Sequence, residues 1–80
     1  MICTITQEDI NKGDKASPTN CAVAIALSRT LGIPIAVSNT KFYGVEKDGH
    51  PLAQAVQTWI WSFDKGRHVE PISFEVEMAP

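Results

Sequence analysis

The sequence predicts a single α+β domain, residues 1–80, in which two main helices cover one face of a four-stranded, mostly antiparallel sheet. Two long segments repeat apolar residues with the period of a helix, and short segments rich in Ile, Val and Thr alternate as strands do. Glycine, proline and asparagine separate these segments. With 80 residues, of which 44% are hydrophobic and 20% charged, the chain has the size and composition of one globular domain.

A first strand and a short helical turn are expected at the N-terminus. Residues 1–6 are rich in Ile and Thr and alternate weakly, as in a strand. Thr6 stands three positions before Asp9, so its hydroxyl can cap a helix start, and acidic side chains are favourable in the first turn of a helix. Gly13 is expected to end this short helical segment.

A first main helix is predicted with Ser17 as its N-cap and Pro18 at its first helical position, and it is expected to run to Leu31 before Gly32. The segment is apolar on nearly every side, and its alanines keep the helix thin. Such a helix is expected to lie deep against the sheet. Cys21, near its start, is expected to be a buried core residue.

Two strands are predicted to follow this helix. Residues 33–37 place Ile, Ile and Val on one face, and residues 41–45 follow after a short polar turn. Either Phe42 or Tyr43 faces the core, depending on the register of the second strand. Residues 46–49 have the composition of a loop.

The second main helix is predicted to begin at Pro51 and to carry an apolar stripe on one face. This core stripe consists of Leu52, Val56, Trp59, Ile60 and Phe63. At about 100° per residue, Trp61 falls about 180° from Leu52. The period that buries Trp59 should therefore leave Trp61 in solvent, on the side of the helix that also carries glutamine and threonine.

The last strand, residues 71–77, has the clearest alternation in the chain. Its inward residues are Ile72, Phe74 and Val76, and its outward residues are Ser73, Glu75 and Glu77. The main elements then follow in the order β-α-β-β-α-β, and the short helical turn lies between the first strand and the first main helix. A ferredoxin-like arrangement is one candidate topology, and the order of the strands in the sheet stays open.

The candidate partner-binding residues lie on the second main helix and around the last strand. They are Trp61, Gln57, Gln54, Asp64, Glu70, Glu75 and Glu77. An exposed tryptophan is typical of a binding surface, although a loop could instead cover this side chain. The acidic members form a negative strip that favours a basic partner surface; the alternative is that they are only the solvated face of a strand.

Other classes of function are disfavoured by composition and motifs. A net charge of −2 and scattered basic residues argue against direct binding of nucleic acid. Glycine-rich phosphate loops, nucleophile elbows and closely spaced metal-binding pairs are missing from the sequence, so we expect no enzyme, cofactor or metal. Cys3 and Cys21 are expected to be reduced thiols of a cytosolic protein. The longest apolar run, residues 21–27, is too short to cross a membrane.

Four segments resemble a pattern found in small phage and prophage proteins, which read TQxDIxxG, CPVAxAL, FDxG and xxPxxFx in this order. Here they are TQEDINKG at residues 6–13, CAVAIAL at 21–27, FDKG at 63–66 and VEPISFE at 69–75. The motifs describe a capped turn, a thin helix, a helix end and a strand, so the resemblance bears more directly on fold than on activity. Ala22 stands where relatives often carry proline, and the preceding loop lacks a cysteine that relatives have, which weakens any redox or metal role.

This group of phage proteins includes anti-CRISPR inhibitors of type I systems. The resemblance therefore implies a phage-encoded protein that binds a type I CRISPR–Cas surveillance complex (Cascade) and blocks target DNA binding. It further implies action in the cytoplasm of the infected bacterial host, as a monomer or weak homodimer without catalytic residues. The competing interpretation is a phage structural or host-takeover module that makes protein–protein contacts and has no CRISPR role.

Overall fold

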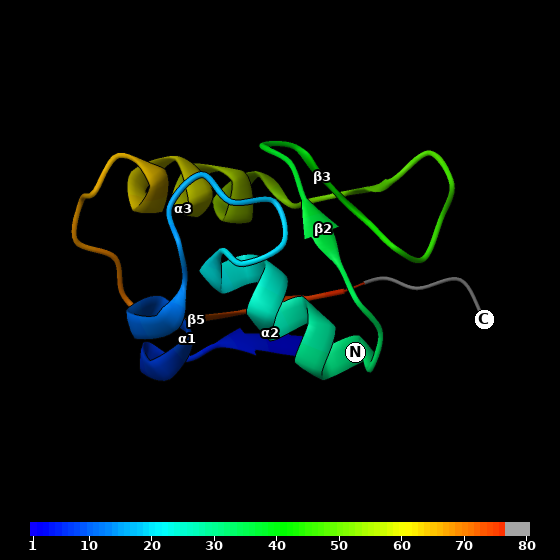
Figure 1. Cartoon of the computed structure of the whole chain (residues 1–80), viewed down its shortest axis with the longest axis horizontal. Helices are drawn as coiled ribbons and strands as arrows, with labels where there is room; N and C mark the ends of the chain where they lie inside the picture. The colour runs from blue at the N-terminus through cyan, green and yellow to red at the C-terminus, as the bar shows by residue number, and fades with distance from the viewer. Residues whose placement is uncertain (77–80) are drawn as a thin grey trace.

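The computed structural model describes residues 1–76 of the chain and confirms the α+β class (Figure 1). Three helices and five short strands lie within these residues. In chain order they are β1 (Ile2–Ile5), α1 (Gln7–Lys12), α2 (Ala22–Leu31), β2 (Ala36–Val37), β3 (Lys41–Tyr43), β4 (His50–Pro51), α3 (Gln54–Asp64) and β5 (Ile72–Glu75). None of these helices has the length and apolar character that crossing a membrane requires.

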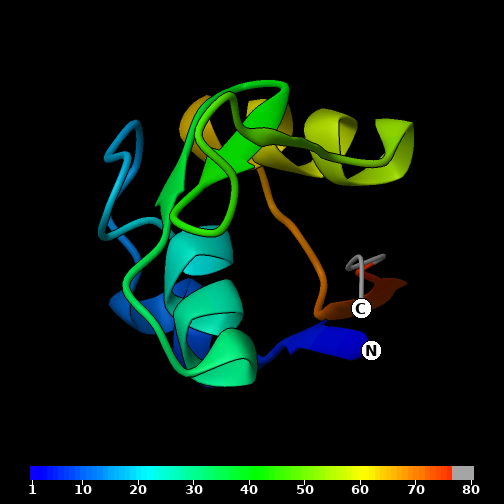
Figure 2. The same cartoon turned by 90° about the vertical axis from the view of Figure 1, so that its right-hand side faces the viewer.

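The prediction of one four-stranded sheet with helices on a single face is wrong, and so is the ferredoxin-like arrangement. In the described residues, β1 pairs with β5 in one antiparallel sheet, and β2, β3 and β4 form another in that order. Helix α2 lies between the two sheets and packs on β1 and β2 (Figures 1 and 2). Because α2 is apolar on nearly all sides, it can be covered by a different sheet on each side.

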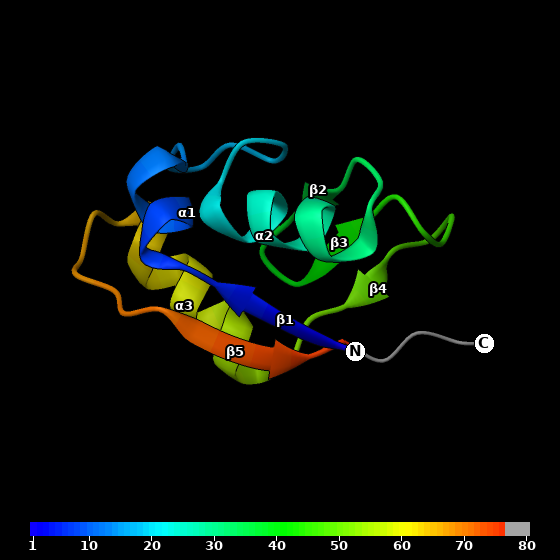
Figure 3. The same cartoon turned by 90° about the horizontal axis from the view of Figure 1, so that it is seen from below.

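The strand pairing explains how the two sheets separate. β1 and β5 come from opposite ends of the chain and lie side by side (Figure 3). β3 pairs on its other edge with β4, where the sequence predicted a loop and a helix start, and Phe42 there opposes His50. Both edges of β3 are therefore occupied inside its own hairpin sheet, and the register is settled with Phe42 buried and Tyr43 exposed.

Helix α1 begins with the predicted capping arrangement. The backbone N–H of Asp9 donates to Thr6 Oγ1 at 3.1 Å, and Asp9 Oδ2 accepts from the backbone N–H of Thr6 at 2.9 Å. This reciprocal pair satisfies two backbone donors that a helix N-terminus otherwise leaves without partners. The turn ends at Gly13, as predicted, and α1 packs against α2.

Gly13 lies where the end of α1 meets the start of α2. A β-carbon at this position would lie 2.6 Å from the backbone nitrogen of Ala22 and 2.9 Å from the carbonyl oxygen of Asp9. Gly13→Ala is therefore expected to push the two helices apart and to lower the free energy of unfolding by about 1–2 kcal/mol. Urea titration followed by circular dichroism measures this loss, and an equal loss in the exposed loop variant Lys47→Ala would contradict the steric explanation.

Helix α2 starts later than the sequence predicted. Ser17 and the proline after it form a separate turn, in which Ser17 Oγ accepts from the backbone N–H of Asn20 at 3.2 Å. The helix begins at Ala22 with Cys21 as its N-cap, whose Sγ accepts from the backbone N–H of Ala24 at 3.4 Å. The local hydrogen bonds of the serine turn compete with helix extension, so the predicted first turn stays outside the helix.

Helix α3 and β5 follow their predicted patterns closely, although α3 begins at Gln54 and not at Pro51. All five residues of the core stripe are buried, Leu52 just before the helix and the others within it. In β5 the inward residues are the more buried ones, and Val76 after the strand is buried as well. The stripe of α3, the two sheets and α2 share one hydrophobic core.

Candidate docking surface around Trp61

Trp61 lies on the solvent side of α3. Its exposed fraction is 50%, whereas that of Trp59, two positions earlier, is 7%. Two helical positions correspond to about 200° of rotation, so one indole points into the core and the other points away from it. The prediction that Trp61 is exposed is confirmed, and the alternative of burial beneath a loop is excluded.

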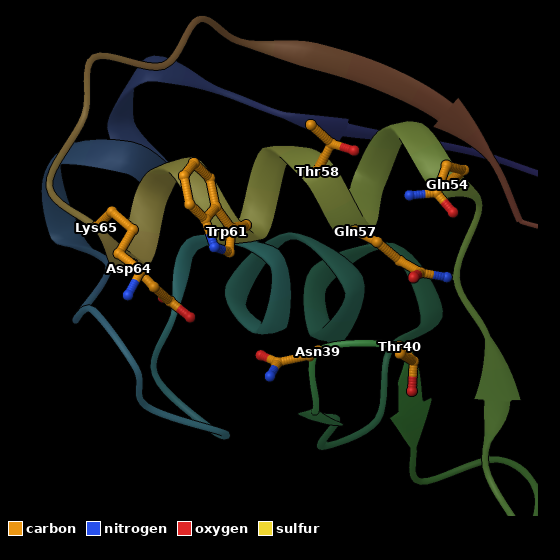
Figure 4. A pocket seen from close by; sticks show the side chains of 8 residues that line it. All are labelled: Asn39, Thr40, Gln54, Gln57, Thr58, Trp61, Asp64 and Lys65. Atoms are coloured by element: carbon orange, nitrogen blue, oxygen red, sulfur yellow. The ribbon is translucent and has the colours of Figure 1, made fainter.

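Trp61 lines a surface pocket of about 660 Å³ (Figure 4). One wall is the polar side of α3, and the other is the turn between β2 and β3. The lining residues are Asn39, Thr40, Gln54, Gln57, Thr58, Trp61, Asp64 and Lys65. Four predicted site residues are thus brought together, and the turn residues Asn39 and Thr40 are additions that the sequence could not place beside them.

Two of these side chains already have structural partners. Gln57 Nε2 donates to the carbonyl oxygen of Leu52 at 2.8 Å and so holds the segment that leads into α3. Asp64 Oδ1 accepts from the backbone N–H of Ala16 at 2.9 Å, which ties the loop between α1 and α2 to the end of α3. Ala16 has a positive φ of 56°, and this bond helps to hold that unfavourable backbone conformation. Both residues shape the pocket as well as line it.

Two cations lie over the exposed indole. Arg67 Cζ is 4.8 Å from the centroid of the Trp61 ring, and Lys65 Nζ is 6.0 Å from it. Sequence reasoning missed both, although Lys65 stands four positions after Trp61, a spacing that brings side chains together at the end of a helix. Arg67 lies beyond the helix, and its position depends on how the helix ends.

The end of α3 folds the chain back toward Trp61. Gly66 adopts a positive φ of 75°, and the backbone N–H of Arg67 donates to the carbonyl oxygen of Ser62 at 3.0 Å. This six-residue closure after a left-handed glycine is a common way to end a helix. The Phe-Asp-Lys-Gly segment was predicted as a helix end. Because the chain reverses direction there, the guanidinium of Arg67 lies over the ring of Trp61.

Of the predicted acidic residues, Asp64 lines this pocket, whereas Glu70 and Glu75 do not. Glu70 Oε1 is 2.7 Å from His68 Nε2, and Glu75 Oε1 accepts from the N-terminal amine of Met1 at 3.2 Å. Neither glutamate lines the pocket of Trp61, and Glu75 instead borders a different one, of about 500 Å³, between β4 and β5. Glu77 lies outside the described residues. The surface beside Trp61 therefore differs in charge from the strip around β5.

The two cysteines are free thiols, and both are buried, as was predicted for Cys21. Burial raises the pKa of Cys21, against the lowering effect of the backbone N–H groups at the start of α2. Burial likewise raises the pKa of Cys3, and the nearby Thr30 only partly offsets it. A thiol that resists deprotonation is a poor nucleophile, so these residues serve packing and capping. Within residues 1–76, no three Cys, His, Asp or Glu side chains gather as metal ligands would.

The surface around Trp61 offers an aromatic ring, two cations, amides and hydroxyls, which suit recognition more than bond-breaking chemistry. We call the pocket residues together with Arg67 the Trp61 surface.

Comparisons of the chain with protein-family models, with curated proteins and with solved structures find no match.

Proposed function

We propose that the protein acts by stoichiometric binding to another protein through the Trp61 surface. The observation that carries this proposal is the half-exposed indole of Trp61 at a pocket formed by two separate elements. Tryptophan and arginine are enriched among the residues that dominate the energy of protein interfaces. Tryptophan covers a large area with few rotatable bonds, and arginine contributes a planar group with several hydrogen-bond donors. A protein that acts by stoichiometric binding needs no catalytic residues of its own.

The partner that we propose is a subunit of a type I CRISPR–Cas surveillance complex in the cytoplasm of an infected bacterium. The resemblance of four sequence segments to motifs of small phage proteins supports this choice. In this proposal the Trp61 surface anchors the protein, while Glu70 and Glu75 oppose the basic groove that receives target DNA. Both glutamates are exposed, and their solvated contacts with His68 and with the N-terminal amine of Met1 can be exchanged for contacts with a basic surface. Target DNA would then be kept out of the complex.

The test is capture of tagged protein from a lysate of a host with an active type I system, followed by mass spectrometry. Wild-type protein is expected to retain Cas subunits, and Trp61→Ala to lose them while its free energy of unfolding changes by less than about 1 kcal/mol. Tyr43→Ala is the matched control, because it also removes an exposed aromatic ring, but from β3 and not from α3. It is expected to capture the same subunits as the wild type.

Two results would contradict the proposal. Capture of Cas subunits by wild type and Trp61→Ala alike would remove the Trp61 surface from the interface. Recovery of only the protein itself or of phage and transcription proteins would reject the CRISPR-related partner. Unfolding of Trp61→Ala would show instead that the ring stabilises the fold.

A phage structural or host-takeover module is a second candidate, and the open edges of the β1–β5 sheet favour it. With only two strands, each strand of this sheet has one edge that carries no further strand among the described residues. Ile2 on β1 is 61% exposed, and exposed apolar edges favour self-association. Sedimentation separates the candidates, because a stable oligomer that is lost in Ile2→Lys favours self-assembly and a monomer favours a foreign partner.

A further inference from the structure

We infer that the Trp61 surface receives an acidic segment of a protein partner, with a carboxylate seated against Arg67 and Lys65 and apolar atoms on the indole. This inference rests on the proposed function, in which the same surface docks on a protein, and it names the chemistry of the docking segment. It also differs from the expectation that the acidic strip of the chain favours a basic partner surface. The argument starts from the cations around Trp61.

Three of the seven basic residues of the chain gather around the end of α3. Lys65 and Arg67 lie over the ring of Trp61, at 6.0 and 4.8 Å from its centroid. Lys15 approaches from the loop between α1 and α2. Its Nζ lies 3.4 Å from the point that a β-carbon would occupy if Gly66 had a side chain. A protein with net charge −2 thus presents a local positive cluster beside its exposed aromatic ring.

None of these three cations has a carboxylate within ion-pair distance among residues 1–76. The comparison with Arg29 and Lys12 is informative, because both of those side chains form ion pairs. Asp64 is the acidic residue of the pocket, and one of its oxygens already accepts from the backbone of Ala16. The positive charge at the Trp61 surface is therefore available to a partner.

The position of Arg67, with Cζ 4.8 Å from the centroid of the Trp61 ring, makes it a good carboxylate receptor. A guanidinium that lies over an indole is already partly dehydrated, so it loses less hydration when a partner covers it, and it carries several donors in a planar fork. A carboxylate can then accept two parallel hydrogen bonds in a setting from which water is partly excluded. The bond from the backbone N–H of Arg67 to the carbonyl oxygen of Ser62 and the left-handed Gly66 hold the backbone of Arg67 close to the end of α3, from where its side chain reaches Trp61.

An acidic protein segment fits this surface better than nucleic acid does. Binding of a phosphate backbone depends on many clustered cations, whereas this surface has two, Lys65 and Arg67, with Lys15 nearby. The side chains of Gln54, Asn39 and Thr40 line the same pocket and carry donors and acceptors that suit peptide groups. Aromatic ring, cations and amides together match a segment with both acidic and apolar side chains.

The test uses three synthetic probes of equal length: a peptide of alternating Leu and Glu, its Leu and Lys counterpart, and oligothymidylate. Each is titrated into 15N-labelled full-length protein, and the indole N–H signal of Trp61 is followed by NMR after assignment with Trp61→Phe. The Leu–Glu peptide is expected to shift the Trp61 signal while that of the buried Trp59 stays in place. The other two probes are expected to bind at least fivefold more weakly.

Charge reversal provides the matched comparison. Arg67→Glu is expected to weaken binding of the Leu–Glu peptide at least tenfold, and the effect should shrink as salt rises. Lys47→Glu changes the net charge of the protein equally but lies in the exposed loop between β3 and β4, so it is expected to change affinity less than twofold. Equal weakening in both variants would show a general charge effect and overturn the inference.

The inference and the proposed function fail in different ways. The inference of an acidic segment would be overturned if the protein preferred the Leu–Lys peptide or oligothymidylate. It would also be overturned if no probe shifted the indole N–H signal of Trp61. Capture of Cas subunits that depends on Trp61 but not on Arg67 would also overturn it, and the proposed function would stand. Binding of the Leu–Glu peptide at Trp61 without capture of any Cas subunit would support the acidic segment and reject the proposed partner.

Discussion

Trp59→Ala is expected to lower the free energy of unfolding by about 3–5 kcal/mol, the usual cost of truncating a buried tryptophan. The indole is 7% exposed and stacks on Phe63, with ring centroids 5.4 Å apart and an angle of 12° between the planes. Its Nε1 donates to the carbonyl oxygen of Glu70 at 2.8 Å, which fastens the segment that leads into β5. The substitution leaves a cavity and removes the partner of that carbonyl.

The measurement is urea unfolding followed by far-UV circular dichroism. A domain of this size has about 5–10 kcal/mol of stability, so Trp59→Ala should lose a large share of it and unfold at much lower urea. Trp61→Ala is the matched control, in which the same residue type is removed from the other side of the helix. Similar losses in both variants would contradict the assignment of Trp59 to the core and Trp61 to the surface.

The contrast between these two tryptophans was readable in the sequence because it depends only on helical period. A helix turns by about 100° per residue whatever its surroundings, so the core stripe and the exposed position follow from spacing alone. The same holds for the cap formed by Thr6 and Asp9, since both partners lie within one turn of chain. Features with partners close in sequence were therefore predictable.

The division into two sheets was not predictable in this way. β2 and β4 have two residues each, too few to show an alternating pattern, and β4 contains a proline that suggested a helix start. β1 and β5 pair across almost the whole chain, from Ile2 opposite Glu75 to Ile5 opposite Ile72. Nothing in the local pattern of either strand specifies that partner, because the shared apolar core and α2 select it.

The candidate site shows the same limit. Gln54, Gln57 and Trp61 could be grouped because they share one side of a helix, and they do line one pocket. Arg67 was missed because its approach to Trp61 needs the left-handed turn at Gly66, which reverses the chain direction. The glutamates on and near the last strand were included among the binding candidates because of their negative charge. Charge does not determine which pocket a side chain lines.

Arg29→Ala is the other substitution expected to have a large effect, a loss of about 3 kcal/mol at neutral pH. The Arg29 guanidinium donates from Nη1 to Asp9 Oδ1 at 2.7 Å and from Nη2 to Asp9 Oδ2 at 2.9 Å. Nη2 also donates to the carbonyl oxygen of Thr4 at 2.9 Å, so the pair joins β1, α1 and α2. The Asp9 side chain is only 4% exposed, and without Arg29 it would be a buried charge with no counterion.

The ion pair gives this loss a defined pH dependence. Burial would raise the pKa of Asp9, but the hydrogen bonds from Arg29 and Thr6 outweigh it and hold the pKa below its ordinary value. A carboxyl group with a lowered pKa in the folded state stabilises the fold above its unfolded pKa of about 4. That contribution is lost as the pH falls through the folded pKa, when the folded protein also takes up the proton.

Unfolding of wild type, Arg29→Ala and Lys12→Ala between pH 7 and pH 2 tests the ion pair. Arg29→Ala is expected to be much less stable than wild type at pH 7, and the difference should disappear only as the pH falls through the lowered folded pKa of Asp9 in wild type, where the carboxyl group is protonated in both proteins. Lys12→Ala breaks an exposed ion pair with Glu8 and should stay close to wild type throughout. A constant difference between Arg29→Ala and wild type across this range would mean that Arg29 stabilises the protein through packing alone.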